Sequence, residues 1–176
     1  MMKRIGLLSD THSYLDKGVI KHLSECDEIW HAGDIGNIAV TDHLANWKPL
    51  RAVWGNIDGH VHRSHFKKDE VFEVEGVKVV MTHIAGYPGR YIPEARELIR
   101  LHRPKLFICG HSHILKVQFD KSNKLLHMNP GAAGVHGFHQ VKTVLRFTVG
   151  DGKITDLEVV ELGKRSDFKP IDLGVS

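Results

Sequence analysis

Cysteine is scarce in this chain, and its scarcity excludes two classes of protein. Only two of the 176 residues are cysteine, and Cys26 and Cys109 each stand alone inside an apolar run. A disulfide framework or a thiolate zinc site needs cysteines paired at short spacing. We therefore expect both thiols to be ordinary core residues.

Long hydrophobic runs and a strong excess of one charge are also lacking. No apolar segment approaches the length that crosses a bilayer, and the run near the N-terminus is too short for a signal peptide. These features predict a cytoplasmic protein with no membrane partner. The formal net charge is +3, with the basic residues scattered along the chain, so composition alone does not indicate nucleic-acid binding.

Histidine, in contrast, is abundant, with 14 residues. It is the commonest side-chain metal ligand and titrates near neutral pH. The surplus is compatible with a metal site built from histidines, and the alternative is a set of surface histidines.

Apolar runs and helical patterns alternate in the first half, which is typical of parallel strands joined by crossover helices in an α/β protein. Strands are expected at 5–8, 28–32, 50–54, 71–74, 77–82, 106–109, 115–119, 124–128, 144–149 and 154–160, and helices near 19–23, over 39–47 and over 93–102. Residues 58–69 show no periodicity and are predicted to form a loop. Residues 1–176 are interpreted as one domain, with 163–176 as an irregular surface tail.

Polar residues of one kind follow directly on these predicted strands. They are Asp10, His12, Asp34, Asn56, His83, His111 and His113. Strands that end at the same edge of a sheet bring such residues together. Two carboxylates and four imidazoles at short range carry a large desolvation penalty unless a cation is bound among them.

Each motif has an ordinary structural explanation when it is taken alone. Asp10 and His12 are compatible with a helix cap, and Gly33-Asp34 and Gly55-Asn56 are common turn dipeptides. Only the ordered set, with every member at the end of a strand, makes the structural explanation inadequate.

The ordered set resembles the motifs of the calcineurin-like metallophosphoesterase superfamily. The motifs are Asp10-x-His12, Gly33-Asp34, Gly55-Asn56-x-Asp58, His83 and Gly110-His111-x-His113, and Asn129-Pro130-Gly131 also resembles a turn of its small bacterial and archaeal phosphodiesterases. Relatives of that branch include the retromer scaffold subunit. The resemblance implies a mixed two-sheet β sandwich flanked by helices, in four α/β/β/α layers.

The resemblance also implies two divalent metal ions. One would be held by Asp10, His12, Asp34 and His113, and the other by Asp34, Asn56, His83 and His111, with Asp34 bridging. A ligand set of nitrogen and oxygen suits Mn²⁺ first, with Ni²⁺, Zn²⁺ or Fe as alternatives. A hydroxide bridging the two ions would attack phosphorus in line, with Asp34, Asn56 and His111 as the catalytic residues.

One position departs from the family pattern. Many members have a histidine after the motif asparagine, whereas Ile57 stands here and offers no proton to a leaving group, a form of help worth roughly 10² to 10⁴ in rate. We therefore expect activated phosphodiesters to be preferred over monoesters. Asn56, Tyr87 and Arg90 are the expected substrate-binding residues, and Asp58 is expected to support a ligand histidine.

The sequence leaves several alternatives open. A scaffold of the same fold is disfavoured because all seven ligand positions hold competent side chains. A nuclease is disfavoured because 176 residues leave no room for a capping domain. A phosphomonoesterase remains the nearest rival. The expected partner is a small phosphoester, and a homo-oligomer is neither indicated nor excluded.

Overall fold

The computed structural model describes residues 1–174 and contains two five-stranded sheets. The strands are β1 (Met2–Leu8), β2 (Glu28–His31), β3 (Leu50–Ala52), β4 (Asp69–Val74), β5 (Val77–Thr82), β6 (Leu106–Ile108), β7 (Leu115–Asp120), β8 (Leu125–Pro130), β9 (Val141–Gly150) and β10 (Lys153–Lys164). The helices are α1 (Lys17–His22), α2 (Ala39–Trp47), α3 (His60–His65), α4 (Pro93–His102) and the short 3-10 helix η1 (Arg165–Asp167).

Both sheets are mixed. The first has the order β10-β9-β1-β2-β3, in which β1, β2 and β3 run parallel and β9 and β10 run antiparallel to their neighbours. The second has the order β4-β5-β6-β8-β7, with β5, β6 and β8 parallel. The alternation of strands and helices in the first half predicted the parallel strands β1, β2 and β3, whereas the mixed sheets implied by the resemblance are the ones found: β4 pairs with β5, β7 with β8, and β9 with β1 and β10, all antiparallel.

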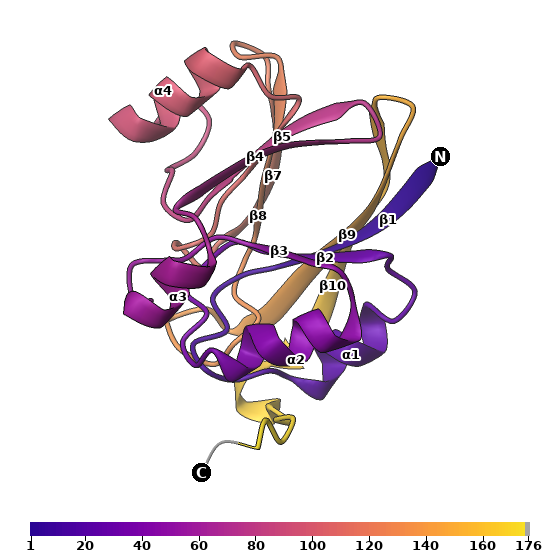
Figure 1. Cartoon of the computed structure of the whole chain (residues 1–176), viewed down its shortest axis with the longest axis vertical. Helices are drawn as coiled ribbons and strands as arrows, with labels where there is room; N and C mark the ends of the chain where they lie inside the picture. Colours follow the sequence, from indigo (N-terminus) through magenta and orange to yellow (C-terminus); the bar gives the residue numbers. More distant parts are fainter. Residues whose placement is uncertain (175–176) are drawn as a thin grey trace.

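Four layers result from this arrangement. The main core lies between the sheets and includes Trp30, Met81 and Phe147. A second core packs α1 and α2 against the first sheet, and a third packs α4 against the second sheet. Figure 1 shows α1 and α2 outside one sheet and α4 outside the other. The expected α/β/β/α sandwich is thus confirmed. Cys26 and Cys109 are both free and buried.

Two local expectations are wrong. The segment expected to be a loop contains α3, a helix too short to show a helical period in the sequence; it packs through buried His62, and the Arg63 guanidinium lies 4.5 Å from the Trp54 ring. The tail is not wholly a surface extension. Ile171 donates its amide to Leu15 O at 2.8 Å, and it packs on the second core together with Leu173. In the described part of the chain, no helix is long and apolar enough to cross a membrane.

Candidate metal centre

The loops after β1 and β2 are joined by backbone hydrogen bonds. Asp10 N donates to Gly33 O at 3.0 Å, and His12 N donates to Asp34 O at 3.1 Å. Because β1 and β2 are adjacent and parallel, their carboxyl ends lie side by side. The first sheet therefore delivers Asp10, His12 and Asp34 to one edge.

The second sheet delivers three histidines to the same place. His83 follows β5, and His111 and His113 follow β6. Gly110 N donates to His83 O at 3.0 Å, which joins these two loops. Asn129 on β8 holds the loop that carries His111 and His113, because its side-chain amide nitrogen donates to Gly110 O at 2.8 Å.

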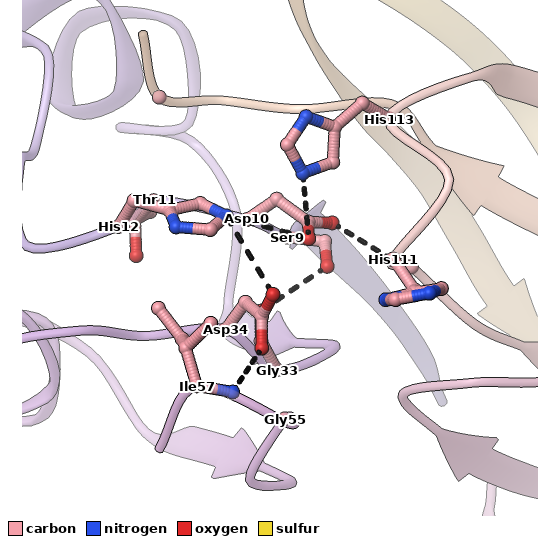
Figure 2. A network of polar contacts seen from close by, with 12 residues as sticks. Ser9, Asp10, Thr11, His12, Gly33, Asp34, Gly55, Ile57, His111 and His113 are labelled. Atoms are coloured by element: carbon pink, nitrogen blue, oxygen red, sulfur yellow. Dashed lines mark hydrogen bonds and ion pairs between the residues drawn. The ribbon is translucent and has the colours of Figure 1, made fainter. Parts of the chain in front are cut away.

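Two groups of possible ligand atoms result, and within each group the atoms lie within 4.8 Å of one another. The first triad is Asp10, His12 and His113, and the second triad is Asp34, His83 and His111. Figure 2 shows the carboxylates of Asp10 and Asp34 at the centre, with His12, His111 and His113 around them.

Asp34 faces both triads. Its Oδ2 lies 3.6 Å from His12 Nε2 in the first triad, and its Oδ1 lies 3.1 Å from His83 Nε2 in its own triad. Asp10 Oδ1 lies 3.2 Å from His113 Nε2 and 3.9 Å from His83 Nε2. The two triads therefore share one continuous site.

Several of these atoms are buried without a hydrogen-bond partner. Among the described residues they include Asp10 Oδ1, His12 Nε2 and His83 Nε2. Such groups carry a desolvation cost unless they are paired. They lie close to one another and yet lack hydrogen-bond geometry, as expected for lone pairs directed at a common point. The donor set therefore fits divalent cations, with one triad for each of two ions.

The pKa values of the residues in the site are shifted in different directions. Burial opposes the charge of Asp34, but His83, the backbone amide of Ile57 and His12 together outweigh that effect and lower the pKa of Asp34. Burial likewise disfavours protonated His83, but the carboxylates of Asp34 and Asp10 raise its pKa. Asp10 raises the pKa of His113, whereas burial lowers the pKa of His12 and of His111. Asp34 thus holds negative charge where a cation would bind.

The backbone of the site is held in an uncommon conformation. Positive φ angles between 47° and 68° are found at Asp10, His12, Asp34, His111 and His113. Non-glycine residues seldom adopt this region, and such residues cluster at functional sites. Gly55 also has no room for a side chain, because a Cβ atom there would lie 2.1 Å from Asp34 Oδ1. The surrounding hydrogen bonds therefore impose the geometry of the loops.

His31 fixes the loops of the first sheet. It is fully buried, accepts from Gly33 N through Nδ1 at 3.1 Å, and contacts Thr11 Oγ1 through Nε2 at 2.9 Å. Burial lowers its pKa to about 4, so the ring is neutral at physiological pH. It acts on the position of the loops rather than as a ligand.

Asp58 has a different role from the one expected. Its carboxylate accepts the backbone amides of Ile35, Gly36 and Gly55 at 3.1, 2.9 and 2.7 Å, rather than a ligand histidine. These amides belong to the loops after β2 and β3. Asp58 therefore joins the two loops that carry Asp34 and Asn56 through these hydrogen bonds.

The expected substrate-binding residues lie around the triads. Asn56 is exposed and lines a hollow of about 210 Å³ together with His83. Tyr87 lines another hollow, of about 490 Å³, together with His111 and Lys116. Arg90 donates its amide to Tyr87 O at 2.8 Å, but its side chain is not among the described residues that line this hollow. The structure thus places Tyr87 in the lining of a hollow beside the triads, whereas Arg90 is not part of the lining of either described hollow.

Two histidines at the site were not predicted. The ring of His136 lies 5.3 Å from that of His12, and the ring of His139 lies 5.3 Å from that of His113. Both follow the Asn129-Pro130-Gly131 turn in a glycine-rich segment. That composition, together with the histidine surplus, was the only signal, and neither residue stands at the end of a predicted strand.

The fold and the two triads define a class of α/β protein with two candidate metal-binding triads on the loops at the strand ends of two sheets. Residues 2–152 match the family model of the calcineurin-like phosphoesterase superfamily domain, and the chain belongs to this superfamily.

Two curated relatives and one solved structure illustrate the likeness. A probable metallophosphoesterase of Methanothermobacter thermautotrophicus is 27% identical over 90% of this chain and 92% of its own length. The probable metallophosphoesterase MJ0623 of Methanocaldococcus jannaschii is 29% identical over 84% of this chain and 76% of its own length. The crystal structure of Entamoeba histolytica Vps29 complexed with Zn²⁺ has a TM-score of 0.64 at 17% identity, covering 90% of this chain and 98% of that one. At such identity the structural likeness shows the fold alone.

Proposed function

We propose that the chain is a binuclear metal-dependent phosphoesterase that hydrolyses phosphodiesters and prefers activated diesters over monoesters. The observation that carries this proposal is the pair of Asp/His triads, whose buried ligand atoms have no hydrogen-bond partner among the described residues. Buried ligand atoms without partners carry a desolvation cost, and a non-catalytic scaffold would gain nothing in return for it. The family match and the two probable metallophosphoesterases support the same activity.

The residues divide into two ligand sets that share Asp34. Asp10, His12 and His113 would hold one ion, Asn56, His83 and His111 would hold the other, and the Asp34 carboxylate would be shared between the two sets. Two divalent ions supply a water of lowered pKa as nucleophile and neutralise the oxygens of the phosphoryl group. Mn²⁺ is the ion we favour, with Ni²⁺, Zn²⁺ or Fe as alternatives; Zn²⁺ is the ion named for the Vps29 structure.

The protein's own groups then position the substrate. Asn56, exposed beside His83, would orient a phosphoryl oxygen through its amide. Tyr87 would contact one organic arm of the ester in the hollow beside His111. The Ile57 amide donates to Asp34 Oδ1 at 3.1 Å, and its side chain, 47% exposed, has no proton to give. A leaving group that needs no proton is therefore favoured.

A panel of phosphoesters tests the proposal. Bis-aryl, mono-aryl and alkyl phosphates are assayed with Mn²⁺, Ni²⁺, Zn²⁺ and no metal. The expected result is metal-dependent cleavage, fastest for the bis-aryl diester. Absence of hydrolysis with every metal would contradict the proposal.

A further inference from the structure

The loop 135–139 carries a phenylalanine whose side chain lies entirely in solvent, with a relative exposure of 102% for Phe138. Single exposed apolar side chains are common on protein surfaces. The setting of Phe138 distinguishes it, because the residues on both sides of it contact the candidate metal centre.

This loop is built directly against the first triad. Gly137 has φ +113°, and a Cβ atom there would lie only 2.2 Å from His113 Nδ1, so only glycine fits. His136 and His139 each place a ring 5.3 Å from a triad histidine, His12 and His113 respectively. Phe138 is thus held at the rim of the site on the side of the first triad.

Hydrogen bonds fix the loop on both flanks. His139 Nε2 lies 2.8 Å from Gly134 O, and Gly134 N donates to Asp10 O at 3.1 Å. On the other flank, Arg165 N donates to Gln140 O at 2.9 Å. The loop and the start of η1 therefore form two connected walls.

A groove of about 870 Å³ lies between these walls. Its lining includes Phe138 and His139 from the loop, Lys164 from the end of β10 and Arg165 from the start of η1. Lys164 and Arg165 are both exposed, and none of the described lining residues is acidic. The groove therefore combines an aromatic face with two positive charges and adjoins the metal centre through His139.

We propose that this groove binds an aromatic, anionic arm of the phosphodiester substrate, of the kind found in a nucleotide. The planar ring would stack on Phe138, and the anionic group would lie against Lys164 and Arg165. The inference rests on the proposed function and specifies the class of substrate. The hollow at Tyr87 would receive the other arm.

Two other occupants fit less well. A strand of nucleic acid is usually held by a longer basic track with successive stacking residues, and this groove offers two cations and one phenyl ring. A second copy of the chain in a two-fold contact centred on this groove would bring two identical patches together, each with Lys164 and Arg165 and no acidic lining residue, so like charges would repel.

Calorimetric titration of the metal-loaded protein with three probes tests the inference. Adenosine 5′-monophosphate has both ring and charge, ribose 5-phosphate has only the charge, and adenosine has only the ring. We expect the monophosphate to bind tightest. Phe138→Ala should weaken its binding by about tenfold, in the range lost with one base–aromatic stack, and leave ribose 5-phosphate unaffected. Arg165→Met should weaken both phosphates.

Matched variants and a second method complete the design. Phe119→Ala removes a phenyl ring that is 58% exposed on β7, in the other sheet, and should change nothing. Equal binding of the monophosphate to wild type and Phe138→Ala would overturn the inference. So would a Phe138-dependent dimer in sedimentation, or a short single-stranded DNA that binds tighter than all three probes. Binding is measured without turnover, so the two proposals can fail separately. Phe138-dependent binding in a protein that hydrolyses no phosphoester would refute the proposed function and still support binding in the groove.

Discussion

Asp34 Oδ1 lies 3.1 Å from His83 Nε2, and yet that nitrogen is buried without hydrogen-bond geometry to any described partner. The other oxygen of Asp34 faces His12, in the opposite triad, at 3.6 Å. A carboxylate placed in this way serves both halves of the site, and its removal should disturb both.

Asp34→Asn is therefore expected to abolish phosphoesterase activity and to lower the bound metal below two ions per chain. The fold should persist, because the backbone bond from His12 N to Asp34 O does not involve the side chain. Activity, metal content and circular dichroism check this. The exposed Asp42 on α2 provides the control Asp42→Asn, which should behave as wild type. Near-normal turnover of Asp34→Asn would show that the bridging assignment is wrong.

Position 57 should determine the choice between diester and monoester. An aryl leaving group bears its charge unaided, whereas an alkoxide needs a proton that Ile57 cannot give. Wild type should cleave a bis-aryl phosphate faster than the matching mono-aryl phosphate, and Ile57→His should raise the monoester rate relative to the diester rate. The 47% exposure of Ile57 leaves room for an imidazole. A wild type that already prefers the monoester would refute this explanation.

Asp58 should act on metal affinity through loop position. Asp58→Ala leaves the amides of Ile35, Gly36 and Gly55 without their acceptor, so the loops that carry Asp34 and Asn56 can separate. We expect metal affinity to fall by roughly 10- to 100-fold, as for other residues that support metal ligands. Asp58→Asn, which keeps one acceptor oxygen, should fall in between. Metal titration measures the affinity of both variants, and unchanged affinity in Asp58→Ala would contradict the role of Asp58 in holding the two loops together.

The ligand positions were predictable because strand ends are readable from apolar runs, and Asp10, Asp34, His83 and His111 follow such runs. The role of Asp58 was not, because it depends on contacts with amides 22 and 23 residues away in the chain. The buried pair of Lys142 and Asp16, 126 residues apart, was equally hidden, since neither residue lies in a pattern that marks burial. Sequence periodicity reports which face of an element is apolar and does not report which distant loop it meets.

His127 should make stability depend on pH. Its ring is fully buried, with Nδ1 3.0 Å from the Tyr91 hydroxyl, and burial lowers its pKa from 6.5 to about 4. The unfolded chain takes up a proton below pH 6.5, whereas the folded chain stays neutral to about pH 4, so stability falls as pH decreases through this window.

The His127 contribution lost at pH 5 is about 2 kcal/mol. His127→Gln keeps a polar group at this position and cannot titrate. The fall in unfolding free energy between pH 7.5 and pH 5 should therefore be smaller in this variant than in wild type. Buried His31, which shows the same direction of shift, remains in both proteins. Identical pH profiles in urea unfolding would contradict the assignment.

Metal content measured together with activity tests the central claim most directly. Wild-type protein is stripped with excess chelator, reconstituted with Mn²⁺, and analysed for bound metal while cleavage of a bis-aryl phosphate is followed. We predict no hydrolysis in chelator, and recovery that rises with metal to two ions per chain, one for each triad. Full hydrolysis by folded protein in excess chelator would contradict the account.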